Sequence, residues 1–492
     1  MPDRFANVNS GAFLEMVKSH FTFTYNATGA ESCTLFDVHI QVGQTITIDW
    51  GDGSTTTHSG NGGISHAYAG AGAWKVIISN KQAITAIDLT SAKMAMTVDY
   101  NNTMMPNLSY LSLTSVVCTW TVSQTAPMPT GLTFLRFTSQ PGIIWVVNTA
   151  NPMPPELTTL RLATCHNISW TVSVTAPMPP DITYLNLGSV NGIIWNVGPY
   201  APMPAGLTQL RMDNFANLTW VIGPAAPIPP LINTALTLMT IPGISGTINA
   251  VAPMPATILM LVLSDLPNLT WVIDATAPMS AAVTNLVLST LPLVSWTVNV
   301  AAPMPAGVQY LQLGTLPITW VVSAAVPMPA GIIQLALSGL PNLTWLVSAT
   351  ALIPAGSTSL VFDNIPGLTW VADVTNPIPN VCKYLFITLC NGVSIPAAQW
   401  ANKNALQEVE FTSGLLTAVV DDILLGVWTN KANYTYSTPV LDLLGNANQA
   451  PSGVYQEGSG GGGEPVSGKE YAYDLVIGHY TTAGPEWVVT TA

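Results

Sequence analysis

Charged residues are scarce in this sequence of 492 residues. Lys and Arg together number 12 and Asp and Glu number 25, so charged residues make up 8% of the chain and the net charge is −13. Ordinary globular domains are about 25% charged, and proteins that bind nucleic acid need clustered Lys and Arg to neutralise phosphates. The composition therefore excludes a nucleic-acid partner and predicts a mostly neutral surface.

Long hydrophobic runs and cysteine motifs are missing as well. Pro, Asn, Thr or Ser interrupts every apolar run well short of the roughly 18 residues that indicate a membrane span. The beginning, MPDRFANVNSGAFLEMVKSHF, has no signal-peptide pattern. The five cysteines show no CxxC spacing, so we expect them to be small buried side chains. We therefore expect no membrane span and no ordinary secretion.

A Pro-Met-Pro element, with Met or Ile at its centre, recurs through the middle of the chain. Its central residues lie at positions 128, 153, 178, 203, 228, 254, 279, 304, 328, 353 and 378. Tryptophans keep the same period: Trp120, Trp145, Trp170, Trp195, Trp220, Trp271, Trp296, Trp320, Trp345 and Trp370. One unit of about 25 residues cannot offset its own ordering entropy, so the units must stack. The period predicts a solenoid of about eleven coils around an internal ladder of stacked indole rings.

Each unit contains two segments with the alternation of half-buried strands. Residues 207–212 follow the pattern LxxLxL, and residues 218–222 follow an alternating LTWxV-like pattern. The first pattern resembles leucine-rich repeats, except that an apolar residue such as Leu266 replaces their usual asparagine. The resemblance implies a leucine-rich-like solenoid with strands on two faces; a flattened β-solenoid is the alternative. Gly246 takes the place of a tryptophan, and we expect a local kink there.

Residues 21–82 have a different pattern from the repeats. A strand runs into the tight turn Trp50–Gly53, the triplet His66-Ala67-Tyr68 follows, and Gly72 precedes a strand that ends at Ile78. The stretch resembles a PKD domain, which is an immunoglobulin-like sandwich of cell-surface and viral proteins. The resemblance implies attachment or spacing, and we expect His66 to hydrogen-bond to the turn.

The sequence predicts a mainly β chain in four parts. They are an N-terminal segment at 1–20, the PKD-like sandwich at 21–82, the repeat solenoid at 83–397 and an α+β cap at 398–492. Within the cap we expect a helix at 419–428, a flexible loop at Gly460–Gly463, and then a helix and a final strand. This ending resembles leucine-rich repeat proteins encoded by phages and prophages.

Signals for catalysis are weak. No GxSxG, HExxH, P-loop or EF-hand pattern occurs, and the histidines lack metal-ligand spacing. Asp274 holds the same repeat position as Asp373, and Asp265 lies one position from that of Asp363; we expect turn or cap roles for these aspartates. We therefore predict a protein that is not an enzyme and has no metal or cofactor. A carbohydrate-active enzyme that uses Asp363 and Asp373 is the remote alternative.

Three arginines share one repeat position, with Asn186 between the second and the third. Arg136, Arg161 and Arg211 occupy the variable position inside LxxLxL, which points outward from the strand. We interpret them first as solvated surface charges and, as the alternative, as contacts for an acidic partner or a glycan.

The sequence favours a structural and adhesive role in a phage particle, as part of a tail, fibre or appendage that contacts the host surface. The missing export signal, the PKD-like module and the neutral repeat surface motivate this hypothesis. Expected partners are further virion proteins, other copies of the chain, and a host glycan or protein. The alternative is a surface adhesin or filament subunit located outside a bacterial cell.

Overall fold

The computed structural model describes residues 19–400, 403, 405–412, 417–429, 440–443, 450–454, 456, 465, 467–477 and 488–491. The protein is mainly β, with 45% strand and 6% helix, and its core is a β-solenoid of about 14 turns. The predicted fold class is confirmed. The chain divides into two compact units, Met1–Gly246 and Thr247–Ala492. Most of the predicted N-terminal segment and the glycines at 460–463 lie outside the described residues.

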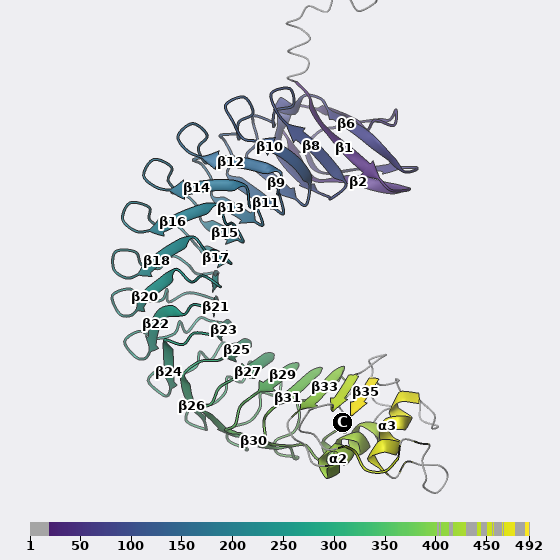
Figure 1. Cartoon of the computed structure of the whole chain (residues 1–492), viewed down its shortest axis with the longest axis vertical. Helices are drawn as coiled ribbons and strands as arrows, with labels where there is room; N and C mark the ends of the chain where they lie inside the picture. Colours follow the sequence, from purple (N-terminus) through teal and green to yellow (C-terminus); the bar gives the residue numbers. More distant parts are fainter. Residues whose placement is uncertain are drawn as a thin grey trace, which may run out of the picture. The chain divides into compact units, whose positions relative to one another are not determined.

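The first unit begins with a sandwich of two β-sheets (Figure 1). Its strands are β1 (Phe21–Ala27), β2 (Glu31–Ile40), β3 (Ile46–Asp49), β4 (Thr55–His58), β5 (Asn61–Tyr68), β6 (Gly72–Ile78), β7 (Ile84–Thr90) and β8 (Met94–Val98), with a 3-10 turn η1 at Lys81–Ala83. One sheet has the antiparallel order β4-β3-β6-β1-β8, and the other pairs β5, β2 and β7.

Both sheets of the sandwich continue directly into the solenoid. Strand β7 pairs in parallel with β9 (Tyr110–Thr114), and β8 pairs in parallel with β10 (Val117–Thr121). The sandwich therefore covers the open end of the first coil, which would otherwise expose its apolar core. The two sheets run through the domain boundary that we expect near residue 82.

Each coil contributes one strand to each of two parallel sheets. We name them the leucine sheet, built from the LxxLxL segments, and the tryptophan sheet. In the first unit the leucine sheet contains β9, β11 (Phe134–Thr138), β13 (Thr159–Ala163), β15 (Tyr184–Gly188), β17 (Gln209–Asp213) and β19 (Ala235–Met239). The tryptophan sheet contains β10, β12 (Ile143–Val147), β14 (Ile168–Val172), β16 (Ile193–Val197), β18 (Leu218–Ile222) and β20 (Ile244–Ile248).

The second unit repeats this arrangement. Its leucine sheet contains β21 (Met260–Ser264), β23 (Asn285–Ser289), β25 (Tyr310–Gly314), β27 (Gln334–Ser338), β29 (Ser359–Asp363), β31 (Tyr384–Thr388), β33 (Glu408–Thr412), β34 (Val440–Leu443) and β35 (Val488–Thr491). Its tryptophan sheet contains β22 (Asn268–Ile273), β24 (Val294–Val298), β26 (Ile318–Val322), β28 (Leu343–Leu346), β30 (Leu368–Val371) and β32 (Gly392–Ser394). Turns without the Pro-Met-Pro element bring the total above the eleven that the element marks.

The repeat tryptophans are all buried in the coils. Nine of the ten side chains are at most 1% exposed, and Trp296 is 3% exposed. Each indole N–H donates a hydrogen bond to a backbone carbonyl six residues later, as Trp120 does to Ala126 at 2.9 Å and Trp195 to Ala201 at 2.9 Å. A buried indole needs such an acceptor. The tryptophan therefore also holds the loop that enters the Pro-Met-Pro corner.

The pairing register of the tryptophan sheet differs from the expected ladder of stacked indoles. Trp145 lies beside Ile168, and Trp170 lies beside Val147, so successive coils are offset by two residues. Each indole therefore packs beside an aliphatic residue of the neighbouring coil. Ring contacts of two tryptophans are with phenylalanine instead: Trp120 with Phe137 at 6.3 Å, and Trp345 with Phe362 at 6.0 Å between centroids.

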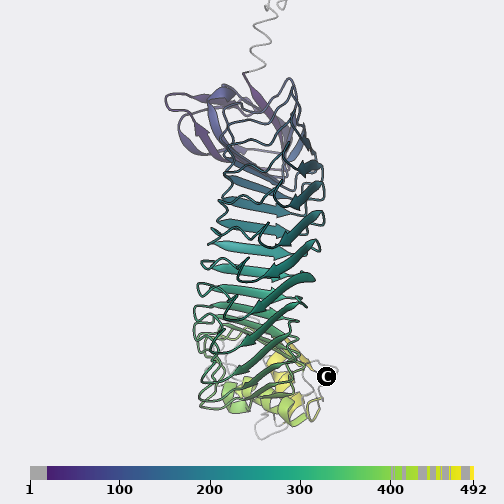
Figure 2. The ribbon, with the colours of Figure 1, turned by 90° about the vertical axis from the view of Figure 1, so that its left-hand side faces the viewer.

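The same offset explains why each unit curves. In the leucine sheet the coils pair in register, as Leu135 does with Leu160, so equivalent residues are one strand spacing apart, about 4.8 Å. In the tryptophan sheet the offset adds about 7 Å along the strand, which separates equivalent residues by about 8 Å. Coils that are closer on one side than on the other must curve, and the leucine sheet lies on the inner side. Figure 2 shows successive strands of the tryptophan side following one another in parallel.

Two side-chain features support the leucine strands. Before six of the leucine strands a threonine donates a hydrogen bond to a carbonyl of the preceding coil, as Thr158 does to the Thr133 carbonyl at 3.1 Å and Thr183 to the Thr158 carbonyl at 3.2 Å. The residue after each leucine strand from β9 to β31 has positive φ, from Ser115 at 56° to Leu389 at 52°. This left-handed residue turns the chain from one sheet to the other.

The backbone geometry at position 246 explains why glycine stands there in place of a tryptophan. The φ of Gly246 is +96°, and a Cβ atom there would lie 2.2 Å from the carbonyl oxygen of Ile222. A side chain is therefore excluded at this point, and Gly246 is also the last residue of the first unit.

A small helical cap follows the last coil (Figure 1). It contains the 3-10 turn η2 (Ala397–Trp400) and the helices α2 (Thr417–Thr429) and α3 (Gly468–Ile477). Helix α2 contains the helix predicted at 419–428. Trp400 is fully buried, with its ring 6.4 Å from that of Phe411.

The five cysteines, Cys33, Cys118, Cys165, Cys382 and Cys390, are buried thiols outside any disulfide. Burial raises the pKa of each thiol, to about 12 for Cys33 and Cys118. The cysteines therefore act as small hydrophobic side chains, as the sequence predicts.

Candidate functional site

The leucine sheet of the first unit exposes a line of arginines. Leucines alternate with outward residues along each strand, and the in-register pairing aligns the outward residues of successive coils. Arg136 pairs with Arg161. Asn186 then separates Arg161 from Arg211. The three arginines proposed from the sequence therefore lie in one column.

Aromatic rings form a second column beside these arginines. The rings of Tyr110 and Phe134 stack with centroids 4.1 Å apart and planes 13° apart. The guanidinium of Arg161 lies 5.7 Å from the Phe134 ring and 4.1 Å from the Tyr184 ring. The repeat pattern did not single out these rings, although they stand two residues before the arginine position in their own repeats. We name this surface, formed by Tyr110, Phe134, Arg136, Arg161, Tyr184 and Arg211, the arginine face.

Compensating acids are few on the arginine face. Among the described residues, Arg211 makes an ion pair with Asp213 at 3.4 Å, while neither Arg136 nor Arg161 has an acidic partner within 4 Å. The Nε atom of Arg161 is buried without a hydrogen-bond partner. Like charges directly opposite each other in a sheet are destabilising. The Arg136–Arg161 pair therefore costs folding energy and leaves positive charge for a ligand.

Of the aspartates considered for catalysis, Asp373 occupies a turn, as does its equivalent Asp274, whereas Asp363 is the last residue of β29. Asp274 accepts hydrogen bonds from the N–H groups of Thr276 at 2.7 Å and Ala277 at 3.1 Å. Asp373 caps the corresponding turn through the N–H groups of Thr375 and Asn376. These carboxylates are engaged in holding the backbone, which is the turn role that the sequence predicts. Asp363 instead accepts a hydrogen bond from the Ser338 hydroxyl at 2.8 Å.

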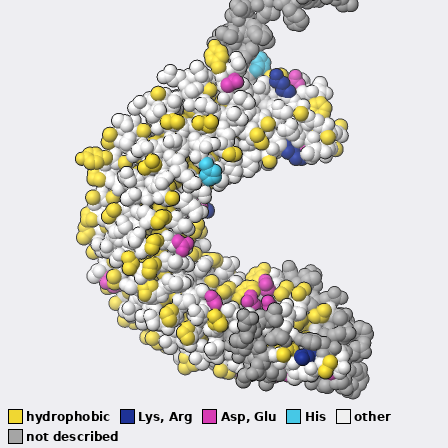
Figure 3. Space-filling model, viewed as in Figure 1, with side chains coloured by type: hydrophobic (Ala, Val, Ile, Leu, Met, Phe, Trp, Pro, Cys, Tyr) yellow, Lys and Arg dark blue, Asp and Glu magenta, His cyan; other side chains and the backbone are white. Residues whose placement is uncertain are grey.

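Acidic residues occur on the leucine sheet of the second unit. Burial raises the pKa of Glu410, and the charges of Asp442, Glu408 and Asp363 add to this effect. Within the ranges that the structure describes, no group of three or more His, Cys, Asp or Glu residues is arranged to hold a metal ion. The surface drawn in Figure 3 is mostly uncharged, so the few charged groups stand out on it.

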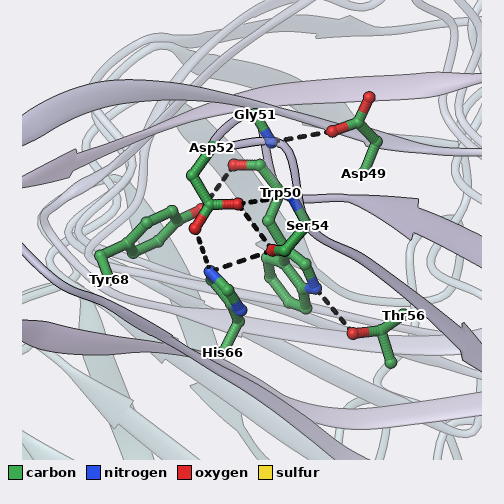
Figure 4. Close-up of polar contacts among 8 residues, drawn as sticks. All are labelled: Asp49, Trp50, Gly51, Asp52, Ser54, Thr56, His66 and Tyr68. Atoms are coloured by element: carbon green, nitrogen blue, oxygen red, sulfur yellow. Dashed lines mark hydrogen bonds and ion pairs between the residues drawn. The ribbon is translucent and has the colours of Figure 1, made fainter.

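The turn of the sandwich contains a polar cluster around Asp52 (Figure 4). The Asp52 carboxylate contacts His66 Nε2 at 2.8 Å and accepts a hydrogen bond from the Ser54 hydroxyl at 2.6 Å. The Tyr68 hydroxyl donates to the Trp50 carbonyl at 2.9 Å. The hydrogen bond predicted for His66 is therefore present.

This cluster is structural, although it contains Ser, His and Asp. In a catalytic triad the aspartate and the serine contact opposite nitrogens of the imidazole. Here Asp52 and Ser54 both approach Nε2, at 2.8 and 3.5 Å. The ring of His66 also stacks on Trp50 with centroids 4.8 Å apart, which fixes the histidine against the sandwich core.

Acid should destabilise the sandwich through Asp52. Hydrogen bonds from Ser54, and then from His66, lower the pKa of Asp52 from 3.8 to about 2. The stability that this carboxylate contributes is present above its unfolded pKa and is lost as the pH falls from about 4 to about 2. Urea unfolding of the chain between pH 2 and 6 measures the effect.

Asp52→Asn should remove most of that pH dependence, because the amide does not titrate. Asp181→Asn, at an exposed position of the solenoid, is the matched control and should keep the dependence of the unaltered chain. An Asp52→Asn variant whose sandwich still loses stability with the original slope would contradict the role assigned to Asp52.

Comparisons with known proteins show distant similarity to plant receptor structures. No protein-family model and no curated protein matches the sequence. Among the helices of the described residues, none is long and apolar enough to cross a membrane. The plant peptide hormone receptor RGFR1 in complex with RGF2 is 14% identical, with a TM-score of 0.39 and coverage of 73% of this chain and 59% of that chain. The PEPR1–AtPEP1 structure is 12% identical, with a TM-score of 0.40 and coverage of 68% and 53%. The leucine-rich repeat ectodomain of the Arabidopsis receptor kinase HAESA, with an extended IDA peptide hormone, is 13% identical, with a TM-score of 0.44 and coverage of 74% and 70%. This chain thus spans only 59% and 53% of the length of the first two.

Proposed function

We propose that this chain is a non-enzymatic adhesion protein that binds its target through the arginine face. The observation that carries the proposal is the aligned pair Arg136 and Arg161, which has no acidic partner among the described residues. Only 12 of 492 residues are Lys or Arg, so two adjacent uncompensated arginines are a marked concentration of positive charge. Such a surface attracts and orients an anionic partner.

The solenoid would serve as the spacer that presents this face. Within each unit the coils share two sheets and an apolar interior, so each coil supports the next. The strand register holds the outward side chains at fixed spacing. A ligand longer than one coil would therefore meet several ordered contacts at once.

We further propose that the chain works as a structural component of a phage particle, in a tail, fibre or appendage. The PKD-like pattern of the sandwich and the scarcity of surface charge support this setting, because an uncharged surface does not repel further copies or other virion proteins. Host-surface glycans or proteins would be the targets. An adhesin or filament subunit on a bacterial surface is the alternative.

The adhesive role can be tested with two matched double variants. Arg136→Ala/Arg161→Ala removes two positive charges from the arginine face, and Lys75→Ala/Lys383→Ala removes two from exposed positions elsewhere. Labelled chains would be measured for adsorption to cell envelopes of the bacteria that serve as hosts. We expect the arginine variant to lose most of its adsorption, while the lysine variant keeps that of the unaltered chain.

Two outcomes would overturn the adhesive role. One is full adsorption by the folded arginine variant, and the other is an equal loss in both variants, which would show dependence on net charge alone. Mass spectrometry of purified phage particles distinguishes a virion component from a bacterial surface protein. A virion component is present in the particles in many copies.

A further inference from the structure

Among the described residues, Arg161 has ring contacts that the other two arginines of the arginine face lack. Its guanidinium lies over the Tyr184 ring at 4.1 Å on one side and faces the Phe134 ring at 5.7 Å on the other. Within the described part of the chain, Arg136 and Arg211 have no such ring contact. A guanidinium fixed between rings loses little freedom when it forms hydrogen bonds with a ligand.

The charge of Arg161 is not compensated by a hydrogen-bond acceptor among the described residues. No carboxylate or carbonyl in the described ranges accepts a hydrogen bond from its guanidinium, and its Nε atom is buried without a partner. A planar oxyanion is the matching group, because a carboxylate accepts two parallel N–H bonds from a guanidinium. The neighbouring Arg136, in register on the adjacent strand, adds a second positive charge.

Building on the function proposed above, we propose that the arginine face binds an acidic polysaccharide, with a uronate carboxylate seated on Arg161. The column of arginines runs across successive coils, so a polymer along it meets Arg136 and Arg161 about 4.8 Å apart. Arg211 follows two coils later, beyond Asn186. A polymer that carries a carboxylate on each sugar can supply a partner to each of these arginines.

The surrounding side chains favour a glycan over an acidic peptide. The Tyr110 and Phe134 rings face each other, and Arg161 covers the Tyr184 ring. The ring faces that these contacts cover are therefore not free to pack against the aromatic anchor residues that dominate many protein interfaces. Asn186 and Gln209 instead present amides, which donate and accept hydrogen bonds as sugar hydroxyls require.

Isothermal titration of the full chain with a galacturonic acid oligosaccharide tests the proposal. Parallel titrations use a neutral galactose oligosaccharide, a sulfated galactose oligosaccharide and poly-glutamate. We expect binding of the galacturonate, weakened by added salt because its charge contacts are exposed, and no binding of the neutral sugar. We expect weaker binding of the sulfated sugar and of poly-glutamate.

Two arginine-to-lysine variants then distinguish the contribution of the planar guanidinium to binding from that of its positive charge. Arg161→Lys keeps the charge but loses the flat, stacked guanidinium, and we expect its affinity for the galacturonate to fall at least about tenfold. Arg136→Lys is the comparison at a position without ring contacts, and we expect its affinity for the galacturonate to fall less than that of Arg161→Lys. Lys75→Arg, at an exposed position outside the arginine face, is the control and should bind like the unaltered chain. Equal losses in both arginine-to-lysine variants would refute the assigned role of Arg161.

The outcomes also separate this inference from the adhesive role. If the galacturonate fails to bind, or if poly-glutamate or the sulfated sugar binds as tightly, the ligand class is wrong. The adhesive role would still stand if the arginine double variant loses adsorption. If the galacturonate binds as expected and that variant still adsorbs fully, the adhesive role is wrong and the glycan site remains.

Discussion

Trp195→Ala is expected to lower the free energy of unfolding of the first unit by about 3–5 kcal/mol, the usual cost of removing a large buried aromatic side chain. Trp195 is 0% exposed, and its indole N–H donates to the Ala201 carbonyl at 2.9 Å. The substitution leaves a cavity between two sheets and releases the loop that precedes the proline corner. Urea unfolding followed by tryptophan fluorescence and circular dichroism measures the change.

Two control variants separate the parts of this effect. Trp195→Phe keeps much of the volume but loses the hydrogen bond, so we expect a smaller loss, of about 1–3 kcal/mol. Tyr200→Ala, at a side chain in the same coil that is 81% exposed, should change stability by no more than about 0.5 kcal/mol. If Trp195→Ala changed the free energy of unfolding as little as Tyr200→Ala, the indole would not support the coil.

Gly246→Ala is expected to destabilise the first unit by about 2–4 kcal/mol, because positive φ and steric overlap act together. The φ of Gly246 is +96°, and an added Cβ would lie 2.2 Å from the Ile222 carbonyl oxygen. That oxygen belongs to the backbone, so relief requires movement of the preceding coil. The same unfolding measurement applies.

Gly223→Ala is the matched control in the preceding coil. A Cβ at Gly223 meets nothing within 4 Å, and its φ is not in the left-handed region. We expect its stability to stay within about 0.5 kcal/mol of the unaltered chain, or to rise slightly because alanine restricts the unfolded state. Equal stability of the two alanine variants would mean that the coil around Gly246 adapts without cost.

The arginines and the aromatic rings of the candidate site differ in how far sequence could predict them. Arg136, Arg161 and Arg211 share one repeat position, so the period alone aligns them once the leucine strands pair in register. Tyr110 and Phe134 belong to a column that continues with Thr159, Tyr184 and Gln209, so aromatic and polar residues alternate in it without a fixed rule. Nothing in their spacing indicates that one guanidinium is enclosed between two rings.

The turn of the sandwich was predictable in part. The order of Trp50, Asp52 and His66 in the sequence indicates a tight turn with a histidine near it. The approach of both Asp52 and Ser54 to one imidazole nitrogen depends on how β5 crosses the turn between β3 and β4. That crossing is a tertiary arrangement, and it is what rules out triad geometry.

The sequence by itself determined the coil length, the two strands in each coil and the burial of the tryptophans. These properties are local, because the period and the alternation of apolar residues decide which side chains avoid water. Only the tertiary structure decided the two-residue offset in the tryptophan sheet, which sets indoles such as Trp145 beside Ile168 and curves each unit. The pairing register depends on how whole coils pack. The proline corners have to connect a leucine sheet that pairs in register with a tryptophan sheet that is offset by two residues. For the same reason, the contacts between Arg161 and its neighbouring rings emerge only when the coils are assembled.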